Sequence, residues 1–192
     1  MPIPSFSIDG VLPPFVGPSG PGGSSRDMTP YIVTAVEVVS TLGTSTKRRT
    51  ILSHWLDHRA ALRALGFQRG FQWLDGSFVE DKEPNDLDVV TFLFRPVTMV
   101  QPARLAALVG ANAQLFDPAQ AKARYMLDAQ FVDLDASPEI VVNLTRYWVG
   151  LFSHRRVDGL WKGMLQVRLE NAADDAAAKA SLVPTPIGGA GP

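Results

Sequence analysis

Two aspartates separated by one residue, Asp86 and Asp88, are the strongest candidates for chemistry in this sequence. They lie at the head of an apolar, β-branched run, Leu87 to Phe94, whose composition predicts a strand. Because strand side chains alternate between faces, both carboxylates should project from one face, with α-carbons roughly 7 Å apart. Carboxylate oxygens suit Mg²⁺, which takes few protein ligands and completes its shell with water and phosphate oxygens. The pair therefore predicts a magnesium site, with Mn²⁺ as the substitute ion.

A glycine-serine pair, Gly76-Ser77, directly follows a short aromatic run, Phe71 to Leu74, that also predicts a strand. Glycine leaves the backbone unobstructed, and the serine hydroxyl donates hydrogen bonds, so the pair can approach phosphate oxygens closely. Phosphoryl-type transfer needs a metal to neutralise the phosphates and to align the attacking oxygen with the leaving group. Together the two motifs predict a cleft for Mg²⁺ and a nucleoside triphosphate, with ATP as the expected nucleotide.

The segment from Trp73 to Val90 resembles the Gly-Ser and Asp-x-Asp signature of the DNA polymerase β-like nucleotidyltransferase superfamily. The resemblance implies that Gly76 and Ser77 bind the triphosphate and that Asp86 and Asp88 bind metal. It also implies a third metal-binding, catalytic carboxylate on a later strand. Asp128 best matches that pattern, within Leu127-Asp128-Ala129-Gln130-Phe131-Val132, and Asp133 and Asp135 are its competitors at the far end of the same expected strand.

A second resemblance covers most of residues 5 to 170. The opening Ser5 to Pro14 and the run Trp73 to Val90 together resemble an uncharacterised bacterial family of small nucleotidyltransferase-like proteins. This resemblance implies the fold and leaves the reaction open.

The turn between the two motifs is acidic, with Glu80, Asp81 and Glu83 beside a single lysine, Lys82. Acids beside a triphosphate repel it unless they face away or bind metal. Lys82 is therefore a candidate nucleotide contact, and so is Lys162, which precedes Gly163, a small residue that could admit a ligand near the backbone.

Other charged side chains have structural interpretations. His54 and His58 are one helical turn apart but lack the glutamate of a zinc-protease helix, so a solvated helix face is expected. The basic clusters Lys47-Arg48-Arg49 and His154-Arg155-Arg156 could contact phosphate or RNA, although helix ends also favour such charges.

The elements that must position these residues alternate between helix and strand, which predicts an α/β or α+β fold: a mixed sheet with helices packed on one face. The expected helices are 44–66, 102–115, 118–126, 138–152 and 172–180; the expected strands are 71–74, 87–94, 127–134 and 164–169, the last also open to a helical interpretation. Residues 1–26 are a Pro/Gly/Ser-rich arm and linker, which we expect outside the core. We expect residues 27–170 to form the domain, and residues 171–192 to form a helix followed by a flexible tail.

Composition limits the partners and the cellular location that we expect for this protein. A net charge of −1 gives no global footprint for nucleic acid, so DNA binding is not expected. The absence of cysteine excludes disulfides and thiolate chemistry. Without an apolar run of about 18 residues or a signal-peptide pattern, we expect a cytoplasmic protein with no membrane partner.

Three hypotheses follow. The first is a nucleotidyltransferase that moves a nucleoside monophosphate onto a hydroxyl of a protein, a tRNA or a small molecule. The second is a catalytically degenerate binding module in a toxin-antitoxin or phage-defence system, which the acidic turn favours. The third is an unrelated α/β domain, in which Asp86 and Asp88 would fail to meet Gly76-Ser77 in one cleft.

Overall fold

The computed structural model describes residues 3–18, 20–99 and 101–183. Its centre is a five-stranded mixed sheet with the order β1-β5-β2-β3-β4, in which β1 pairs parallel with β5, β3 pairs parallel with β4, and β2 is antiparallel to both β3 and β5. The strands are β1 (Tyr31–Val33), β2 (Gly70–Asp75), β3 (Leu87–Leu93), β4 (Leu127–Asp133) and β5 (Leu165–Arg168). The predicted mixed sheet is confirmed, and residues 165–168 are a strand.

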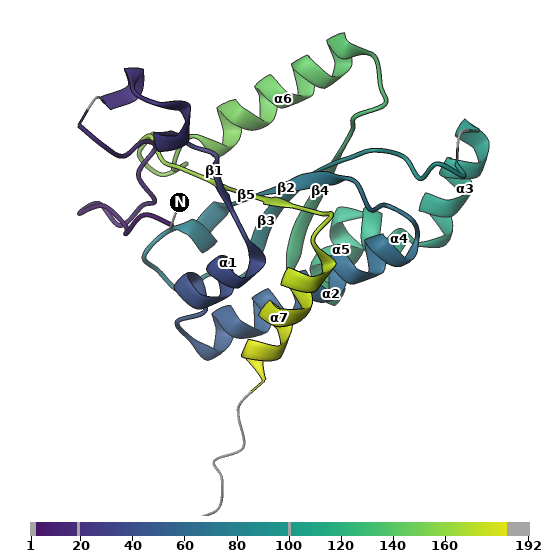
Figure 1. Ribbon diagram of the computed structural model, residues 1–192, viewed down its shortest axis with the longest axis horizontal. Helices are drawn as coiled ribbons and strands as arrows, with labels where there is room; N and C mark the ends of the chain where they lie inside the picture. The colour runs from purple at the N-terminus through teal and green to yellow at the C-terminus, as the bar shows by residue number, and fades with distance from the viewer. Residues whose placement is uncertain (1–2, 19, 100, 184–192) are drawn as a thin grey trace, which may run out of the picture.

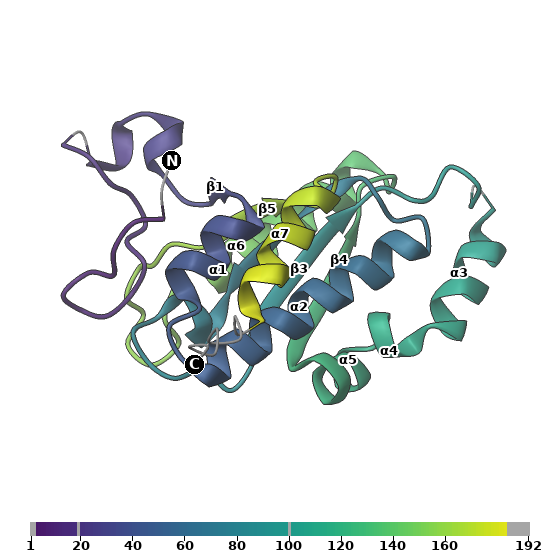
Figure 2. The same ribbon diagram turned by 60° about the horizontal axis from the view of Figure 1, so that its bottom comes forward.

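One face of the sheet is covered by helices that bury the larger hydrophobic core (Figure 1). These helices are α1 (Ala35–Leu42), α2 (Thr46–Ala64), α4 (Ala113–Phe116), α5 (Pro118–Tyr125) and α7 (Ala172–Leu182). The long helix α2 begins where predicted, because the Ser45 hydroxyl accepts a hydrogen bond from the Arg48 amide. Figure 2 shows α2 and α7 side by side in front of the strands.

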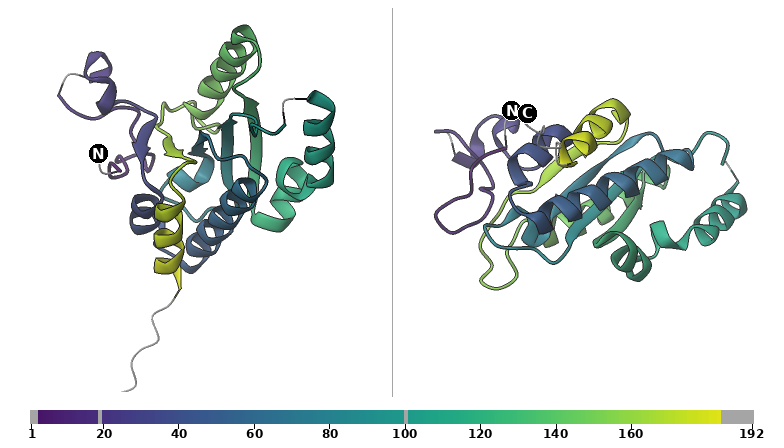
Figure 3. Two further views of the ribbon diagram at one scale, coloured as in Figure 1. Left: turned by 45° about the vertical axis from the view of Figure 1, so that its right-hand side comes forward. Right: turned by 90° about the horizontal axis from the view of Figure 1, so that it is seen from below.

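The opposite face carries α6 (Pro138–Phe152), which projects away from the body and packs on the sheet near its C-terminal end (Figures 1 and 3). A second, smaller core of aromatic and aliphatic side chains lies there: Phe71, Trp73, Val90, Phe92, Val132, Trp148, Leu151 and Phe152. This face is the one that carries the candidate site, because Asp88 and Asp128 alternate with Val89 and Ala129, which belong to the larger core.

Three expectations are corrected. The helix expected over 102–115 is two helices, α3 (Pro102–Ala111) and α4, separated at Asn112. His58 is fully buried, not solvated: its Nε2 lies 3.0 Å from the Leu115 carbonyl oxygen, and burial lowers its pKa to about 4. β1 and α1 lie in a stretch for which no element was predicted.

The N-terminal arm is also part of the core, contrary to expectation. Leu12 is 1 % exposed, its amide donates to the Val79 carbonyl, and its own carbonyl accepts from Gly163. A Cβ at Gly163 would lie 2.4 Å from the Pro13 carbonyl oxygen, so the absence of a side chain at Gly163 leaves room for the backbone of the arm. The expected flexible tail, 184–192, lies outside the described residues.

Among the helices that the structure describes, none is both long enough and apolar enough to cross a bilayer.

Candidate functional site

Three aspartates stand in register across three neighbouring strands. Asp75 at the end of β2 pairs with Asp88 on β3, and Asp88 pairs with Asp128 on β4. Neighbouring strands lie about 4.8 Å apart, and paired residues point to the same face, so the three carboxylates form a row across the sheet. The sequence predicted Asp88 and Asp128 but missed Asp75, because cross-strand register is not visible in one chain segment.

The glycine-serine turn begins at the end of this row. Gly76 has a φ of +73°, a conformation that favours glycine, and a Cβ there would lie 1.5 Å from Asp88 Oδ2. The turn therefore packs directly against the Asp88 carboxylate. The same short 3-10 helix, Gly76–Val79, carries Ser77 to the edge of the pocket.

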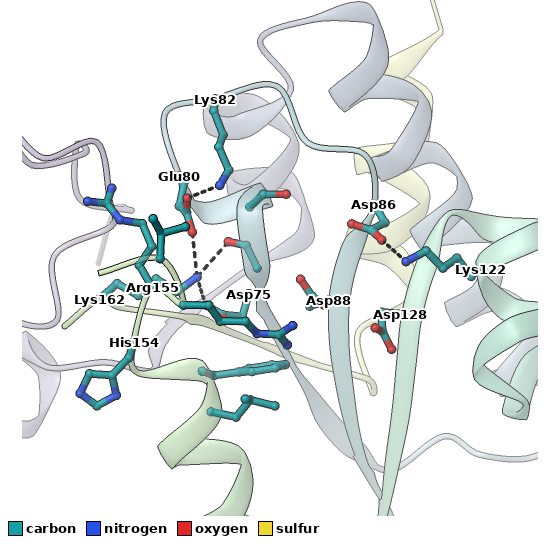
Figure 4. Close-up of a pocket in the computed structure, with 16 residues that line it drawn as sticks. Asp75, Glu80, Lys82, Asp86, Asp88, Lys122, Asp128, His154, Arg155 and Lys162 are labelled. Carbon is teal, nitrogen blue, oxygen red and sulfur yellow. Dashed lines mark hydrogen bonds and ion pairs between the residues drawn. The ribbon is translucent and has the colours of Figure 1, made fainter. Parts of the chain in front are cut away.

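A pocket of about 260 Å³ opens over the row. Every residue that the sequence singled out for the site lines it: Gly76, Ser77, Lys82, Asp86, Asp88, Asp128 and Lys162. Asp88 on β3 and Asp128 on β4 lie close together, and Asp86, just before β3, lies beside them with its carboxylate on Lys122 (Figure 4). The Gly-Ser and Asp-x-Asp motifs therefore meet in one cleft. This argues against the third hypothesis, in which the two motifs would lie apart.

Five carboxylates and five Lys or Arg side chains line this pocket, so their formal charges balance. The acids are Asp75, Glu80, Asp86, Asp88 and Asp128, and the bases are Lys82, Lys122, Lys162, Arg155 and Arg156. Of the three acids in the connecting turn, only Glu80 lines this pocket; Asp81 and Glu83 line another, beside the N-terminal arm. The turn is thus less repulsive to a phosphate than its sequence indicates.

Lys162, which is 2 % exposed, links three parts of the site (Figure 4). Its Nζ donates to the Gly76 carbonyl oxygen at 3.0 Å and to Glu80 Oε1 at 3.3 Å, and it lies 3.2 Å from Asp75 Oδ1 without forming a hydrogen bond to it. Burial raises the pKa of Asp75 to about 7, although the charge of Lys162 lowers it. Burial also favours a higher pKa for Glu80, but hydrogen bonds and charge from Lys82 and Lys162 bring it below its ordinary value.

The connecting turn is held by Arg48, a member of the basic cluster at the start of α2. Its guanidinium is buried and donates to the carbonyl oxygens of Phe78, Glu80 and Lys82 at 2.7 to 2.9 Å. Arg48 therefore fixes the backbone between the two motifs and does not contact phosphate from this position.

Lys122, on α5, is a site residue that the sequence did not reveal. Its Nζ lies 2.6 Å from Asp86 Oδ2, and this contact raises the pKa of Lys122. The pKa of Asp88 is also raised, mainly by burial and then by the negative charges of Asp86 and Asp128. Lys122 thus supplies positive charge to a cluster of mutually repelling carboxylates.

The donor set fits Mg²⁺ bound together with a nucleotide. Across the residues described, no group of three or more His, Asp or Glu side chains is arranged to hold a metal by itself. Mg²⁺ needs only one or two carboxylates when phosphate oxygens and water complete its shell. Asp86, which Lys122 now contacts, and Asp88 offer that pair, and Asp128, in register with Asp88, is the third carboxylate beside them.

Comparison with known proteins finds one family. Residues 4–168 match the family of unknown function DUF6932, and the chain belongs to it. This agrees with the expected resemblance to an uncharacterised family; the match carries no link to the nucleotidyltransferase superfamily. No curated protein and no solved structure matches the chain.

Proposed function

We propose that this member of the DUF6932 family is a nucleotidyltransferase that binds Mg²⁺ and a nucleoside triphosphate, with ATP as the expected nucleotide, over the row Asp75, Asp88 and Asp128. The observation that carries the proposal is the packing of Gly76 against Asp88, with Asp128 in register beside it. A phosphate-binding turn, a metal-binding carboxylate and the proposed base, Asp128, are then immediate neighbours, as phosphoryl transfer requires.

In the proposed reaction the chain's own groups bind and orient the substrates. The Gly76-Ser77 turn and Lys82 contact the triphosphate, and Lys162 holds that turn in place through the Gly76 carbonyl. An acceptor hydroxyl attacks the α-phosphorus, the bond to the β-phosphate oxygen breaks, and pyrophosphate leaves. The hydroxyl proton passes to Asp128. Mg²⁺, when bound to Asp86 and Asp88, would neutralise phosphate charge.

The test uses ATP labelled at its α-phosphate, Mg²⁺ or Mn²⁺, and cell extract. We expect label transfer by the wild-type protein and a loss of more than about 100-fold for Asp88→Ala, since metal stabilisation of the transition state is worth several kcal/mol. Asp81→Asn, in the connecting turn but outside the pocket, is the matched control and should retain transfer. Absence of transfer by the wild-type protein, with no effect of Asp86→Ala or Asp88→Ala, would exclude the enzyme.

A degenerate binding module is the second candidate, and the ion pair between Lys122 and Asp86 favours it. If that pair is permanent, a lysine takes the position of the metal and no transfer follows. In that case the wild-type protein binds neither Mn²⁺ nor ATP, whereas the enzyme binds both. The proposed nucleotidyltransferase activity is consistent with a cytoplasmic location.

A further inference from the structure

A second, smaller pocket of about 180 Å³ shares its wall with the nucleotide pocket. The two have Asp88, Asp128, Leu151, Phe152 and Arg156 in common, and the smaller pocket adds Gln130 and Trp148. Gln130 donates from its amide to Asp128 Oδ1 at 3.2 Å, and Trp148 packs edge-on against Phe152 at 5.6 Å. The carboxylates of the proposed reaction therefore lie where the two pockets meet.

The two pockets differ in chemistry. The larger one contains the Gly-Ser turn and three lysines, whereas the smaller one is lined by Trp148, Leu151 and Phe152 of α6 and by a single cation, Arg156, which the two pockets share. In phosphoryl transfer the attacking and leaving oxygens are roughly in line on opposite sides of the phosphorus. If pyrophosphate leaves through the lysine-lined pocket, the acceptor must approach from the other side of the phosphorus. The smaller pocket is the adjoining space, because it shares Asp88 and Asp128 with the larger one.

The size of the smaller pocket restricts the acceptor. The pocket's volume is about 180 Å³, against about 260 Å³ for the pocket assigned to the triphosphate. The smaller pocket suits a side-chain-sized group better than a second nucleotide. The acceptor hydroxyl should therefore be carried by a small group at the end of a larger molecule that stays outside.

The surface next to this pocket indicates which class of molecule carries the acceptor hydroxyl. Along α6, Ile140, Leu144 and Tyr147 are 51 %, 37 % and 56 % exposed, and their spacing continues one turn further to Leu151 in the pocket wall. We call these four residues the α6 stripe; they lie on the helix that projects from the body (Figure 3). Exposed apolar stripes of this kind bind apolar protein segments.

The charge of α6 does not suit RNA. The helix carries one glutamate and one arginine in 15 residues, so it offers no net positive charge to a phosphate backbone. The nearest other cations, Arg155 and Arg156, line the nucleotide pocket beyond the end of α6 and are not on the apolar stripe.

We propose that the smaller pocket is the acceptor subsite, and that the acceptor is a hydroxyl side chain of a protein segment that lies along the α6 stripe. The inference rests on the proposed nucleotidyltransferase activity. In the transfer, the side-chain oxygen forms a bond to the α-phosphorus, pyrophosphate leaves with the bonding electrons, and the proton moves to Asp128. The product is a protein that carries a nucleoside monophosphate ester.

The test separates cell extract into protein, RNA and small-molecule fractions and supplies each with ATP labelled at the α-phosphate, Mn²⁺ and the full chain. We expect label in the protein fraction, removed by protease and resistant to nuclease. Leu144→Glu and Tyr147→Glu should each lower that labelling about tenfold, as for central interface residues. Their affinity for ATP and their helix content should stay unchanged.

Val142→Glu is the matched control. Val142 is 65 % exposed on the same helix but on another side of it, so labelling by this variant should equal that of the wild type. Label in the RNA or small-molecule fraction would overturn the inference and leave the transferase intact. Equal labelling of protein by all three variants would overturn the docking on α6. Absence of label from every fraction would instead count against the transferase itself.

Discussion

At the scale of single residues, the site depends on contacts that place a carboxylate, a glycine and a lysine within a few ångströms of one another. Asp88 is the central member: Gly76 packs on it, Asp75 and Asp128 flank it in register, and burial raises its pKa. Small changes at its neighbours should therefore alter metal binding without touching Asp88 itself.

Gly76→Ala should be among the most damaging small substitutions. The added Cβ would lie 1.5 Å from Asp88 Oδ2, and the positive φ adds about 1 to 2 kcal/mol of backbone strain. We expect a lower melting temperature and a loss of Mn²⁺ binding. Gly159→Ala is the control, because Gly159 has a φ of +69° but no atom within 4 Å of the place that a Cβ would take. If the two variants lose equal stability and both bind Mn²⁺ normally, the contact with Asp88 is unimportant.

Lys122→Met should bind Mn²⁺ more tightly than the wild type in the absence of nucleotide, by up to about fivefold, because an exposed ion pair is worth at most about 1 kcal/mol. Isothermal titration with Mn²⁺ measures the change. Lys47→Met, which removes an exposed lysine hydrogen-bonded to Asn85 outside the pocket, should leave the affinity unchanged. Weaker Mn²⁺ binding by Lys122→Met would show that Lys122 does not compete with the metal.

Asp75 should make stability depend on pH. Its pKa in the folded protein is about 7, above the ordinary 3.8, so the folded state holds a proton that the unfolded state has released. The stabilising contribution is complete below about pH 4 and is lost as the pH rises to about 7. Asp75→Asn should remove this component, which denaturant unfolding at pH 5 and pH 8 measures. Parallel pH profiles for the two proteins would contradict the assignment.

At the scale of elements, helices α2 and α7 pack on the face of the sheet opposite the candidate site. Asp175 on α7 accepts hydrogen bonds from Arg59 Nε at 2.7 Å and from Arg63 Nη1 at 2.5 Å, and the Arg59 side chain is fully buried. Arg59 also donates to the Gln72 side chain on β2, at 2.9 Å, so this network joins α7 to the strand that ends at Asp75.

Asp175→Asn should cost about 3 to 5 kcal/mol of unfolding free energy, because it leaves a buried guanidinium without its charge partner. The control joins the same two helices: Asp57→Asn removes an exposed ion pair with Lys179 and should cost less than about 1 kcal/mol. Urea unfolding distinguishes them. Similar losses for both variants would mean that burial of the Arg59 pair contributes little.

Several elements were predictable from local signals alone. Capping at residues 44–46, proline near the first turn of α5, apolar residues at helical spacing in α6, and strand-forming residue types identified α2, α5, α6, β3 and β4 within a few residues. The short β1 and α1 were missed. A three-residue strand and an eight-residue helix have too little periodicity to stand out, and their stability comes from packing against β5 and α7.

At the scale of the whole molecule, the N-terminal arm packs together with the face that carries the candidate site. Leu12 is buried in the main core, beside the turn that ends at Val79, although it lies in a Pro- and Gly-rich segment. Arg155, in the pocket wall, also donates to the Asp9 carbonyl oxygen at 2.8 Å. The arm therefore contacts both the turn beside the site and the wall of the pocket.

Leu12→Ala should lower the unfolding free energy by about 2 to 5 kcal/mol, as for other buried leucines. Ile8→Ala, at a fully exposed position in the same arm, should change it by less than about 0.5 kcal/mol. Thermal unfolding of both variants is the measurement. Equal, small effects would mean that the arm packs against the body without adding to the free energy of unfolding.

The sequence by itself determined the residue types of two short motifs and the types of the longer elements, since both depend on residues a few positions apart. Only the tertiary structure decided which carboxylates are neighbours. Asp75, Asp88 and Asp128 come from three strands, and their row exists because β2, β3 and β4 pair in one register. The same packing placed Lys122 on Asp86 and buried Lys162 beside Asp75, because partners distant in the chain meet only when the sheet and its helices assemble.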